Sequence, residues 1–401
     1  MTGDPLFDYP LRRGERLDPP PVLGELRADR PVCPVRLWDG SEAWLVTRHA
    51  DVRAVLADPR VSADPRSPGY PFLSAGRAAA PDGHGSFNHL DPPEHGRFRR
   101  MLSGEFTVER IARLRPVVQR TVDRAIDAMV SAGNRAELVR ALALPVPSFV
   151  ICELLGVPYA DHEFFETRTA ARMDLTRAPE LVRAANAEIM GYLEQLVAEK
   201  RRRPGDDLIS RLITQHGDSG EASPGEIVDM VRLLLVNGYE TTANMIALGV
   251  LVLLRNPDEA AVLRDDPDPE AVERLVEELL RHQTIVHIAP TRAVLAELTV
   301  GGTVLRPGDG VITSLSSANR DATVFDRPDA LDCGRDARRH LSFGHGVHHC
   351  LGHTLARLEL HAVFGTLFRR LPALRLAVPY EEVRFKEDAG LYGVHRLDVT
   401  W

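Results

Sequence analysis

Apolar and polar residues alternate along most of this chain with helical periodicity. Apolar residues recur at spacings of three and four from residue 94 to about 133, and again from 160 to 203, as in amphipathic helices. A shorter helix is predicted at about 49–57 and a last one from near Cys350 to about Leu371. The pattern therefore predicts a mainly helical protein.

One predicted helix differs from the others in length and in its middle. The residues Ser223-Pro224-Gly225-Glu226 form a capping box with proline at the first helical position, and the periodic pattern continues to Asn256-Pro257. Such a helix spans roughly 45–50 Å, the width of a whole domain. Its flanks are apolar, but residues 237–242 read Asn-Gly-Tyr-Glu-Thr-Thr. A buried carboxylate costs several kcal/mol unless it is paired or used, so this segment is a candidate site.

Strands make up a minor part of the predicted fold. Residues 35–38 and 43–47 read as strands joined by a tight turn at Asp39-Gly40. Further short strands, with the sequences LTV, TVL and VITSL, follow the helix that Asp268-Pro269 begins. Residues 61–89 are rich in Pro, Gly, Ser and Ala and are predicted to form a long irregular loop. We expect one domain over 1–401, β-richer at about 30–60 and 285–320 and helical elsewhere.

Charge and cysteine usage exclude several classes of function. The 401 residues include 49 Lys plus Arg against 57 Asp plus Glu, a net charge of −8 that argues against nucleic-acid binding. The four cysteines are scattered without a C-x-x-C pair, which favours a reducing compartment. No apolar run reaches the roughly 20 residues that a bilayer needs. We expect a cytoplasmic protein with neither a signal peptide nor a membrane anchor.

A cluster of histidines surrounds one of the cysteines. Residues 340–353 hold five of the 15 histidines together with Cys350. Zinc prefers such ligands, but the adjacent side chains of His348, His349 and Cys350 do not readily converge on one metal. Gly344 and Gly346 permit a tight turn whose amides approach the sulfur, and Cys350 lies at the start of a helix. Both features favour a thiolate, which is an axial ligand for haem iron.

The spacing in this segment resembles that of a known family. The string F-G-x-G-x-H-x-C-x-G at residues 343–352 is similar to the haem-binding loop of the cytochrome P450 superfamily, and its six fixed positions would arise by chance with odds on the order of one in a million. The resemblance implies a triangular helical bundle around haem b (iron protoporphyrin IX) with small β-sheets. It also implies that Cys350 is the iron ligand.

Three further segments match the family in the expected order. Glu278 and Arg281 resemble its structural E-x-x-R pair, although an ordinary i, i+3 ion pair is common and contributes only about 0.2–0.5 kcal/mol. Residues 319–321 and 338–340 resemble the family's meander region, which completes the network of contacts around the E-x-x-R pair. Residues 237–242 resemble the oxygen-binding segment, with Glu240 at the acid position and Thr241 at the alcohol position. The segment departs from the family pattern at two positions. Asn237 stands where a small residue is usual, and Tyr239 stands where histidine is often found.

Four cationic side chains match positions that bind the haem propionates in the family. His95 and Arg99 lie four residues apart on a predicted helix, Arg292 follows Pro290-Thr291, and His348 lies in the cysteine loop. For each one alone a solvated charge is the favoured explanation, but the four together at the family's spacing favour contact with the haem.

The resemblance is greatest to soluble actinomycete enzymes and extends to the fungal nitric oxide reductases. Because the latter lack the acid–alcohol pair, we expect a monooxygenase that inserts one atom of O2 into a small organic substrate of secondary metabolism. Its electrons would come from NAD(P)H through ferredoxin reductase and ferredoxin. Nitric oxide reduction, nitration or coupling chemistry, and a haem- or zinc-binding protein without catalysis stay open as alternatives.

The resemblance also indicates where a substrate and a redox partner bind. Substrate contacts are expected from the 61–90 loop, the 162–190 helices, Leu235 and Asn237, Ile288 within 285–289, and Leu391 with Tyr392; core packing is an even alternative for each. Arg97, Arg100, Arg338 and Arg339 are candidates for docking an acidic ferredoxin, or form a merely solvated face. The protein is expected to be a monomer.

Overall fold

The computed structural model describes residues 6–14, 16–79, 86–173, 177–264, 268–288, 290–387 and 389–401. Helices dominate, as predicted. They are α1 (Val22–Asp29), α2 (His49–Ala57), α3 (Ala75–Ala79), α4 (Glu94–Ser103), α5 (Val108–Ala112), α6 (Arg115–Ala132), α7 (Pro145–Leu155), α8 (His162–Met173), α9 (Pro179–Arg202), α10 (Leu208–Leu212), α11 (Pro224–Arg255), α12 (Pro257–Ala260), α13 (Pro269–Gln283), α14 (Leu315–Ala318) and α15 (His353–Arg370).

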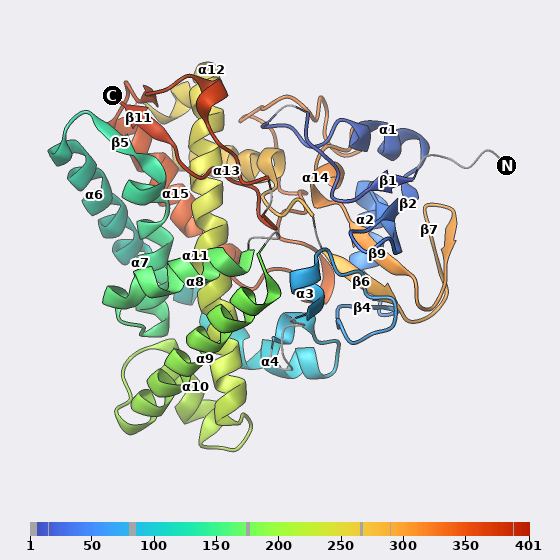
Figure 1. The fold of residues 1–401 in the computed structure, drawn as a ribbon. Coiled ribbons are helices and arrows are strands. Elements are labelled where there is room, and N and C mark those ends of the chain that lie inside the picture. Colours follow the sequence, from blue (N-terminus) through green and yellow to red (C-terminus); the bar gives the residue numbers. More distant parts are fainter. Residues whose placement is uncertain are drawn as a thin grey trace.

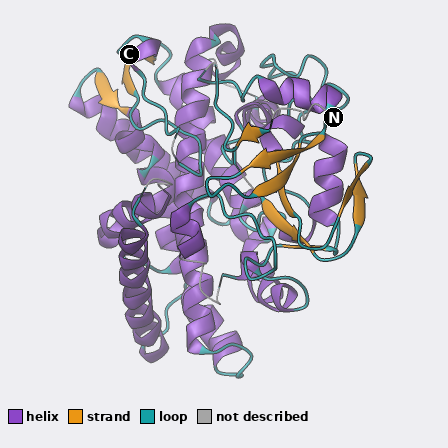
Figure 2. Ribbon diagram, turned by 45° about the vertical axis from the view of Figure 1, so that its right-hand side comes forward, coloured by secondary structure: helices purple, strands orange, loops and turns teal. Residues whose placement is uncertain are grey.

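The strands form a mixed sheet of order β1-β2-β3-β9-β6-β4 and two smaller sheets, β10-β11-β5 and β7-β8. Their bounds are β1 (Phe7–Asp8), β2 (Val32–Arg36), β3 (Glu42–Val46), β4 (Val61–Ser62), β5 (Arg135–Glu137), β6 (Thr291–Val294), β7 (Leu298–Val300), β8 (Thr303–Leu305), β9 (Gly310–Thr313), β10 (Arg375–Leu376) and β11 (Asp398–Thr400). The larger sheet lies beside the helical part (Figure 2). Strands β1, β5, β10 and β11 lie outside the two segments predicted to be β-rich.

Several elements have the boundaries that local sequence signals predicted. Helix α2 covers 49–57, and β7 and β8 are the LTV and TVL segments. Helix α11 begins directly after Ser223, whose hydroxyl accepts a hydrogen bond from the N–H of Glu226 while the Glu226 carboxylate accepts one from the N–H of Ser223. The predicted capping box is therefore confirmed.

The two long periodic stretches are divided into shorter helices. Residues 94–133 form α4, α5 and α6, because a 3₁₀ turn follows Ser103 and Thr107 begins a new helix by accepting a hydrogen bond from the N–H of Arg110. Residues 160–203 form α8 and α9, the second of which starts at Pro179. Helix α15 begins at His353, three residues later than predicted.

Two predictions for irregular or extended segments were partly wrong. The 61–89 loop contains β4, α3 and a 3₁₀ turn at Phe87–His89, while its residues 80–85 lie outside the described part. The VITSL segment is not one strand. Strand β9 ends at Thr313 because the hydroxyl of Ser314 accepts a hydrogen bond from the N–H of Ser317 and caps α14.

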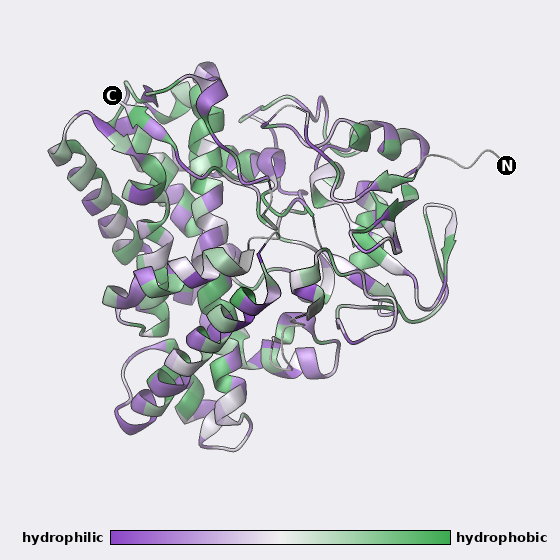
Figure 3. Cartoon of the chain, in the orientation of Figure 1, coloured by the Kyte–Doolittle hydropathy of each residue, from purple (hydrophilic) through white to green (hydrophobic). Residues whose placement is uncertain are grey.

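Helix α11 crosses the helical part from end to end and packs against α7, α9, α13 and α15 (Figure 1). At Gly238 the approach to α7 is so close that a Cβ atom would lie 2.7 Å from the side chain of Ile151. Outer helices such as α6 alternate hydrophobic and hydrophilic residues (Figure 3), as their periodicity predicted. Among the described residues, no helix has the length and apolar character needed to span a membrane.

Candidate functional site

The loop before α15 presents Cys350 to the interior. Gly344 and Gly346 both have φ = +73°, and the Cys350 N–H closes the loop by donating to the Phe343 carbonyl oxygen at 2.9 Å. A Cβ atom at Gly346 would lie 2.4 Å from the carbonyl oxygen of Leu56 at the end of α2. Glycine is therefore required there both for the backbone angle and for the close approach.

The electrostatic environment of the Cys350 sulfur differs from the prediction in one respect. Burial raises the pKa of the Cys350 thiol, and this effect outweighs the N–H groups of Gly352 and His353 and the charges of Arg99 and Arg357, which lower it. The amides that act on the sulfur belong to the start of α15, not to the glycine turn. A metal cation bound by the sulfur would offset the effect of burial and favour the thiolate.

A buried network connects α13 to the segment before the cysteine loop. Arg281 and Glu278, both fully buried, form two hydrogen bonds of 2.7 Å. Arg281 also donates to the Asn319 carbonyl oxygen at 2.9 Å. The side chain of Asn319 in turn donates to the hydroxyl of Ser342 at 2.9 Å and accepts from the N–H of Leu341 at 2.7 Å. The Glu278–Arg281 pair therefore has a larger role than a surface i, i+3 ion pair, because it supports, through Asn319, the chain directly before Phe343.

A second ion pair joins α13 to α15. Arg357 donates to the carboxylate of Glu277 at 2.5 and 2.9 Å, and His340 contacts it at 3.1 Å. Burial alone raises the pKa of Glu277, but Arg357 and His340 lower it to about 2. Of the predicted 338–340 segment only His340 joins this network directly, since the side chain of Arg338 pairs at the surface with Glu273, 3.7 Å away.

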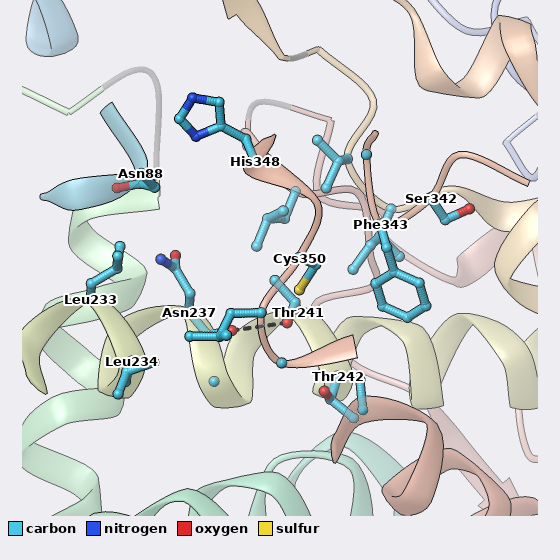
Figure 4. A pocket seen from close by; sticks show the side chains of 18 of the residues that line it. Asn88, Leu233, Leu234, Asn237, Thr241, Thr242, Ser342, Phe343, His348 and Cys350 are labelled. Carbon is cyan, nitrogen blue, oxygen red and sulfur yellow. Dashed lines mark hydrogen bonds between the residues drawn. The ribbon is translucent and has the colours of Figure 1, made fainter. Parts of the chain in front are cut away.

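A cavity of about 450 Å³ lies between the cysteine loop and α11 (Figure 4). Eight of the predicted site residues line it, and they come from α4, α11, the 285–290 segment, the cysteine loop and the turn near residue 390. They are His95, Arg99, Asn237, Thr241, Ile288, His348, Cys350 and Leu391. The fold therefore gathers residues from across most of the sequence around one space.

Basic side chains gather at one part of this cavity: His95, Arg99 and His348 line it, and Arg292 does not line it but lies close to both histidines. The rings of His95 and His348 are 4.2 Å apart, and the buried Arg292 lies close enough to affect both. Burial, followed by the charge of Arg292, lowers the pKa of His348 to about 3. The Nδ1 atom of His348 is buried without a hydrogen-bond partner. Two arginine cations beside two histidines that burial keeps neutral, one of them with an unpartnered ring nitrogen, fit a ligand that carries carboxylate groups.

Only some of the polar residues in the middle of α11 face the cavity. The hydroxyl of Thr241 donates to the Asn237 carbonyl oxygen at 3.0 Å, and the side chain of Asn237 extends into the cavity (Figure 4). Glu240 is buried at 7% exposure and does not line the cavity; it pairs with Lys386 at 2.9 Å. Tyr239 also points elsewhere, donating to the Phe165 carbonyl oxygen of α8 at 3.1 Å.

Several predicted substrate contacts were wrong. Leu235 is 1% exposed and packs in the core, because the cavity-facing stripe of α11 runs through positions 234, 237, 238, 241, 242 and 245 and Leu235 lies one position to the side. Tyr392 is fully buried in the core. No described residue of 162–190 lines the cavity, and Ala289 lies outside the described residues.

The cavity also has lining residues that were not named one by one in advance. Arg77, Phe87 and Asn88 belong to the 61–90 loop, which was expected to contribute, whereas Leu233, Leu234 and Met245 of α11 were not predicted. The helical stripe that contains Asn237 and Thr241 was the signal for the three α11 residues. The 61–90 loop as a whole was predicted, but no local signal singles out Arg77, Phe87 and Asn88 within it.

Glu359 is a second buried carboxyl group beside the cavity. It is fully buried, and neither of its oxygens makes a hydrogen bond of normal geometry. Burial raises the pKa of Glu359 to about 8, with the nearby Thr242 opposing this in part. The group is therefore protonated, and neutral, at pH 7.

This neutral carboxyl predicts a pH-dependent contribution to stability. Between the ordinary pKa of about 4.5 and about 8, the folded state keeps a proton that the unfolded state releases, so the contribution of Glu359 falls as pH rises. As pH rises over this range, the free energy of unfolding of Glu359→Gln is expected to increase relative to that of the wild type by up to about 1.4 kcal/mol per pH unit. Urea unfolding of both proteins at pH 5, 6.5 and 8 measures the difference, and a constant difference would contradict the assignment.

The alternative of a zinc site finds no support in the described residues, where no three His, Cys, Asp or Glu side chains converge so as to hold a metal ion. The histidines near Cys350 instead belong to separate contacts. His353 is hydrogen bonded to Arg357, while His348 packs against His95.

Comparisons with known proteins agree with this geometry. The family model described as Cytochrome P450 matches residues 159–376. The chain is 51% identical to Cytochrome P450-SU2 of Streptomyces griseolus over 96% of its own length and 94% of that protein. The chain belongs to the cytochrome P450 family. It is thus a haem-dependent monooxygenase that uses O2, and the apolar walls, the cysteine and the cationic group fit that cofactor.

Two further relatives of this cytochrome P450 have names that specify a reaction. One is pentalenic acid synthase of Streptomyces avermitilis, 45% identical over 98% of this chain and 97% of that protein. The other is the structure of the mycinamicin VIII C21 methyl hydroxylase MycCI of Micromonospora griseorubida bound to mycinamicin VIII. It is 39% identical with a TM-score of 0.93, covering 99% of this chain and all of that one.

Proposed function

We propose that this cytochrome P450 inserts one oxygen atom of O2 into a secondary-metabolite substrate, with Cys350 as the ligand of a haem b iron. The observation that carries the proposal is the position of Thr241 and Cys350 on the same cavity, with Glu240 next to Thr241 along α11. Nitric oxide reductases of this family lack that acid–alcohol pair.

The residues around the cavity have the chemistry to hold the cofactor. The sulfur of Cys350 would ligate the iron, and His95, Arg99, Arg292 and His348 would bind the two propionates, which supply the negative charge that this cluster lacks. When bound, thiolate-ligated haem supplies the O2 chemistry, since the thiolate favours cleavage of the O–O bond. The protein supplies orientation, protons and exclusion of water.

Proton delivery is assigned to the polar turn of α11. The hydroxyl of Thr241 uses its proton to bond the Asn237 carbonyl oxygen, so its own oxygen can accept a hydrogen bond from a group in the cavity. Glu240 lies one residue earlier, where its carboxylate can take up a proton from the solvent side and pass it toward Thr241. Glu240 and Thr241 together thus supply the protons that O2 reduction consumes.

Replacing Thr241 by alanine is expected to uncouple turnover. Reductant consumption continues, but product per NADPH falls about tenfold or more and hydrogen peroxide rises, because no hydroxyl orders the proton path. The assay contains O2, a ferredoxin, its reductase and NADPH, and Thr241→Ser serves as the control that keeps the hydroxyl. Unchanged coupling in the alanine variant, or direct NADH-dependent consumption of nitric oxide without any oxygenated product, contradicts the proposal.

The substrate is proposed to be a largely apolar molecule with a few oxygen functions. Leucine and isoleucine side chains form the walls near Asn237, and Asn88 and Asn237 supply amide groups for hydrogen bonds. Relatives named for the C21 methyl hydroxylation of mycinamicin VIII and for pentalenic acid synthesis support this substrate class. Leu234, Asn237, Ile288 and Leu391 are proposed to contact the substrate, with Leu234 in the role that was predicted for Leu235.

Electrons are proposed to come from NAD(P)H through ferredoxin reductase and ferredoxin. Arg100, Arg338 and Arg339 are exposed and available to dock an acidic partner. Arg97 is not part of this face, because its guanidinium pairs with Glu226 at the start of α11. That the enzyme works as a cytoplasmic monomer stays a prediction.

A further inference from the structure

A hairpin near the C-terminus connects the cavity to the outer side of α11. Phe385 and Val394 form an antiparallel bridge, and the N–H of Lys386 donates to the Gly393 carbonyl oxygen at 2.9 Å. Closer to the tip, Gly390 and Leu391 line the cavity. The base of this hairpin, which carries Lys386, lies against the segment of α11 that contains Glu240.

The carboxylate of Glu240 is held between this hairpin and its own helix. Lys386 Nζ lies 2.9 Å from Glu240 Oε1. The side-chain amide of Asn244, one turn further along α11, donates to the backbone oxygen of Glu240 at 2.8 Å and to Oε1 at 3.3 Å. The side chain of Glu240 is 9% exposed and that of Lys386 20%, so the pair lies at the boundary between solvent and interior.

The contact between the hairpin and Asn244 is tight. A Cβ atom at Gly393 would lie 2.0 Å from Asn244 Oδ1, so the hairpin backbone passes directly against this amide. The position of Lys386 relative to Glu240 is consequently fixed by backbone packing and does not depend on the flexible lysine side chain alone.

Position 386 is occupied by lysine, a residue that is rare in this chain. Lys200 and Lys386 are the two lysines among 49 basic residues. Lysine offers one compact charge with rotatable donors, whereas arginine tends to clamp both carboxylate oxygens in a fixed fork. A single contact at Oε1 holds the Glu240 carboxylate while leaving it able to reorient, which a residue that relays protons requires.

We propose that Lys386 is a positioning residue for proton delivery in this enzyme, an inference that rests on the proposed role of Glu240. The ammonium group holds the carboxylate of Glu240, the residue directly before Thr241 along α11. A proton taken from solvent converts this carboxylate to the acid, the acid passes that proton toward Thr241, and the carboxylate returns to Lys386, which stays protonated throughout.

The test compares Lys386→Met with Lys386→Arg in the complete ferredoxin-dependent system. We expect the methionine variant to bind substrate with the same spin-state change and the same affinity. Its product per NADPH should fall about tenfold and its solvent kinetic isotope effect on turnover should rise, because proton transfer becomes rate-limiting. The arginine variant should recover most of the coupling. Lys200→Met is the matched control, since Lys200 pairs with Asp207 at 2.6 Å, does not line the cavity, and its loss should leave coupling unchanged.

The outcomes separate this inference from the proposed function. If Thr241→Ala uncouples turnover but Lys386→Met does not, the inference is wrong and the proposed function stands. If neither Thr241→Ala nor Glu240→Gln changes coupling, the proton path itself is wrong. A methionine variant that loses haem, with no recovery in Lys386→Arg and no change in isotope effect, would show a merely structural role and would also overturn the inference.

Discussion

Replacing Arg281 by methionine is expected to give a protein that unfolds easily and retains little haem. The guanidinium is fully buried, and its removal leaves the Glu278 carboxylate buried without its main partner. Breaking a buried pair in this way costs about 3–5 kcal/mol. The Asn319 carbonyl oxygen also loses its hydrogen bond from Arg281. This weakens the support that the Asn319 side chain gives to Ser342, directly before the cysteine loop.

Haem content per protein and the free energy of unfolding measure this effect. Arg274→Met on the same helix is the matched control, because its contact with Glu270 is 3.8 Å long and both side chains are well exposed. That substitution should change stability by less than about 0.5 kcal/mol. If the two variants were equally stable and held equal amounts of haem, the buried network would not have the supporting role described above.

Replacing Cys350 by serine is expected to abolish substrate oxidation while leaving the fold intact. The loop around this residue is held by the hydrogen bond from its backbone N–H to Phe343 and by the packing of Gly346 on α2, neither of which uses the sulfur. A hydroxyl is a poor substitute for a thiolate at iron, so turnover should fall on the order of a thousandfold or more.

Turnover, circular dichroism and the unfolding midpoint together check this prediction. Cys333→Ser is the control, since Cys333 is also buried but lies away from the cavity, near Glu259. That variant should keep both fold and turnover. A Cys350→Ser protein that still oxidised substrate at the wild-type rate would contradict the assignment of the iron ligand.

Local signals in the sequence were sufficient for many of the elements. The capping box at Ser223 placed the start of α11, and the proline after Asp268 placed that of α13. The cysteine motif, together with the acid and alcohol on α11, indicated the family before any tertiary information. In each case the information lies within a few neighbouring residues, so it can be read without knowing the fold.

The remaining features depend on contacts between distant segments. Lys386 and Glu240 are separated by 146 positions, and no spacing rule connects them. Leu235 was chosen without knowing which stripe of α11 faces the cavity, and a shift of one position turns a helical side chain by about 100°. The amides at the start of α15 that favour a thiolate at Cys350 could be expected from the sequence, but the burial that raises its pKa could not, because it depends on contacts between distant segments.

The central claim is that the sulfur of Cys350 ligates haem iron in this cytochrome P450, and the absorption spectrum of the reduced protein with carbon monoxide tests it most directly. The wild type is expected to show the strongly red-shifted Soret band of thiolate-ligated haem, and Cys350→Ser is expected to lack it. A wild-type band at the position typical of nitrogen-ligated haem, or the same band in both proteins, would contradict it.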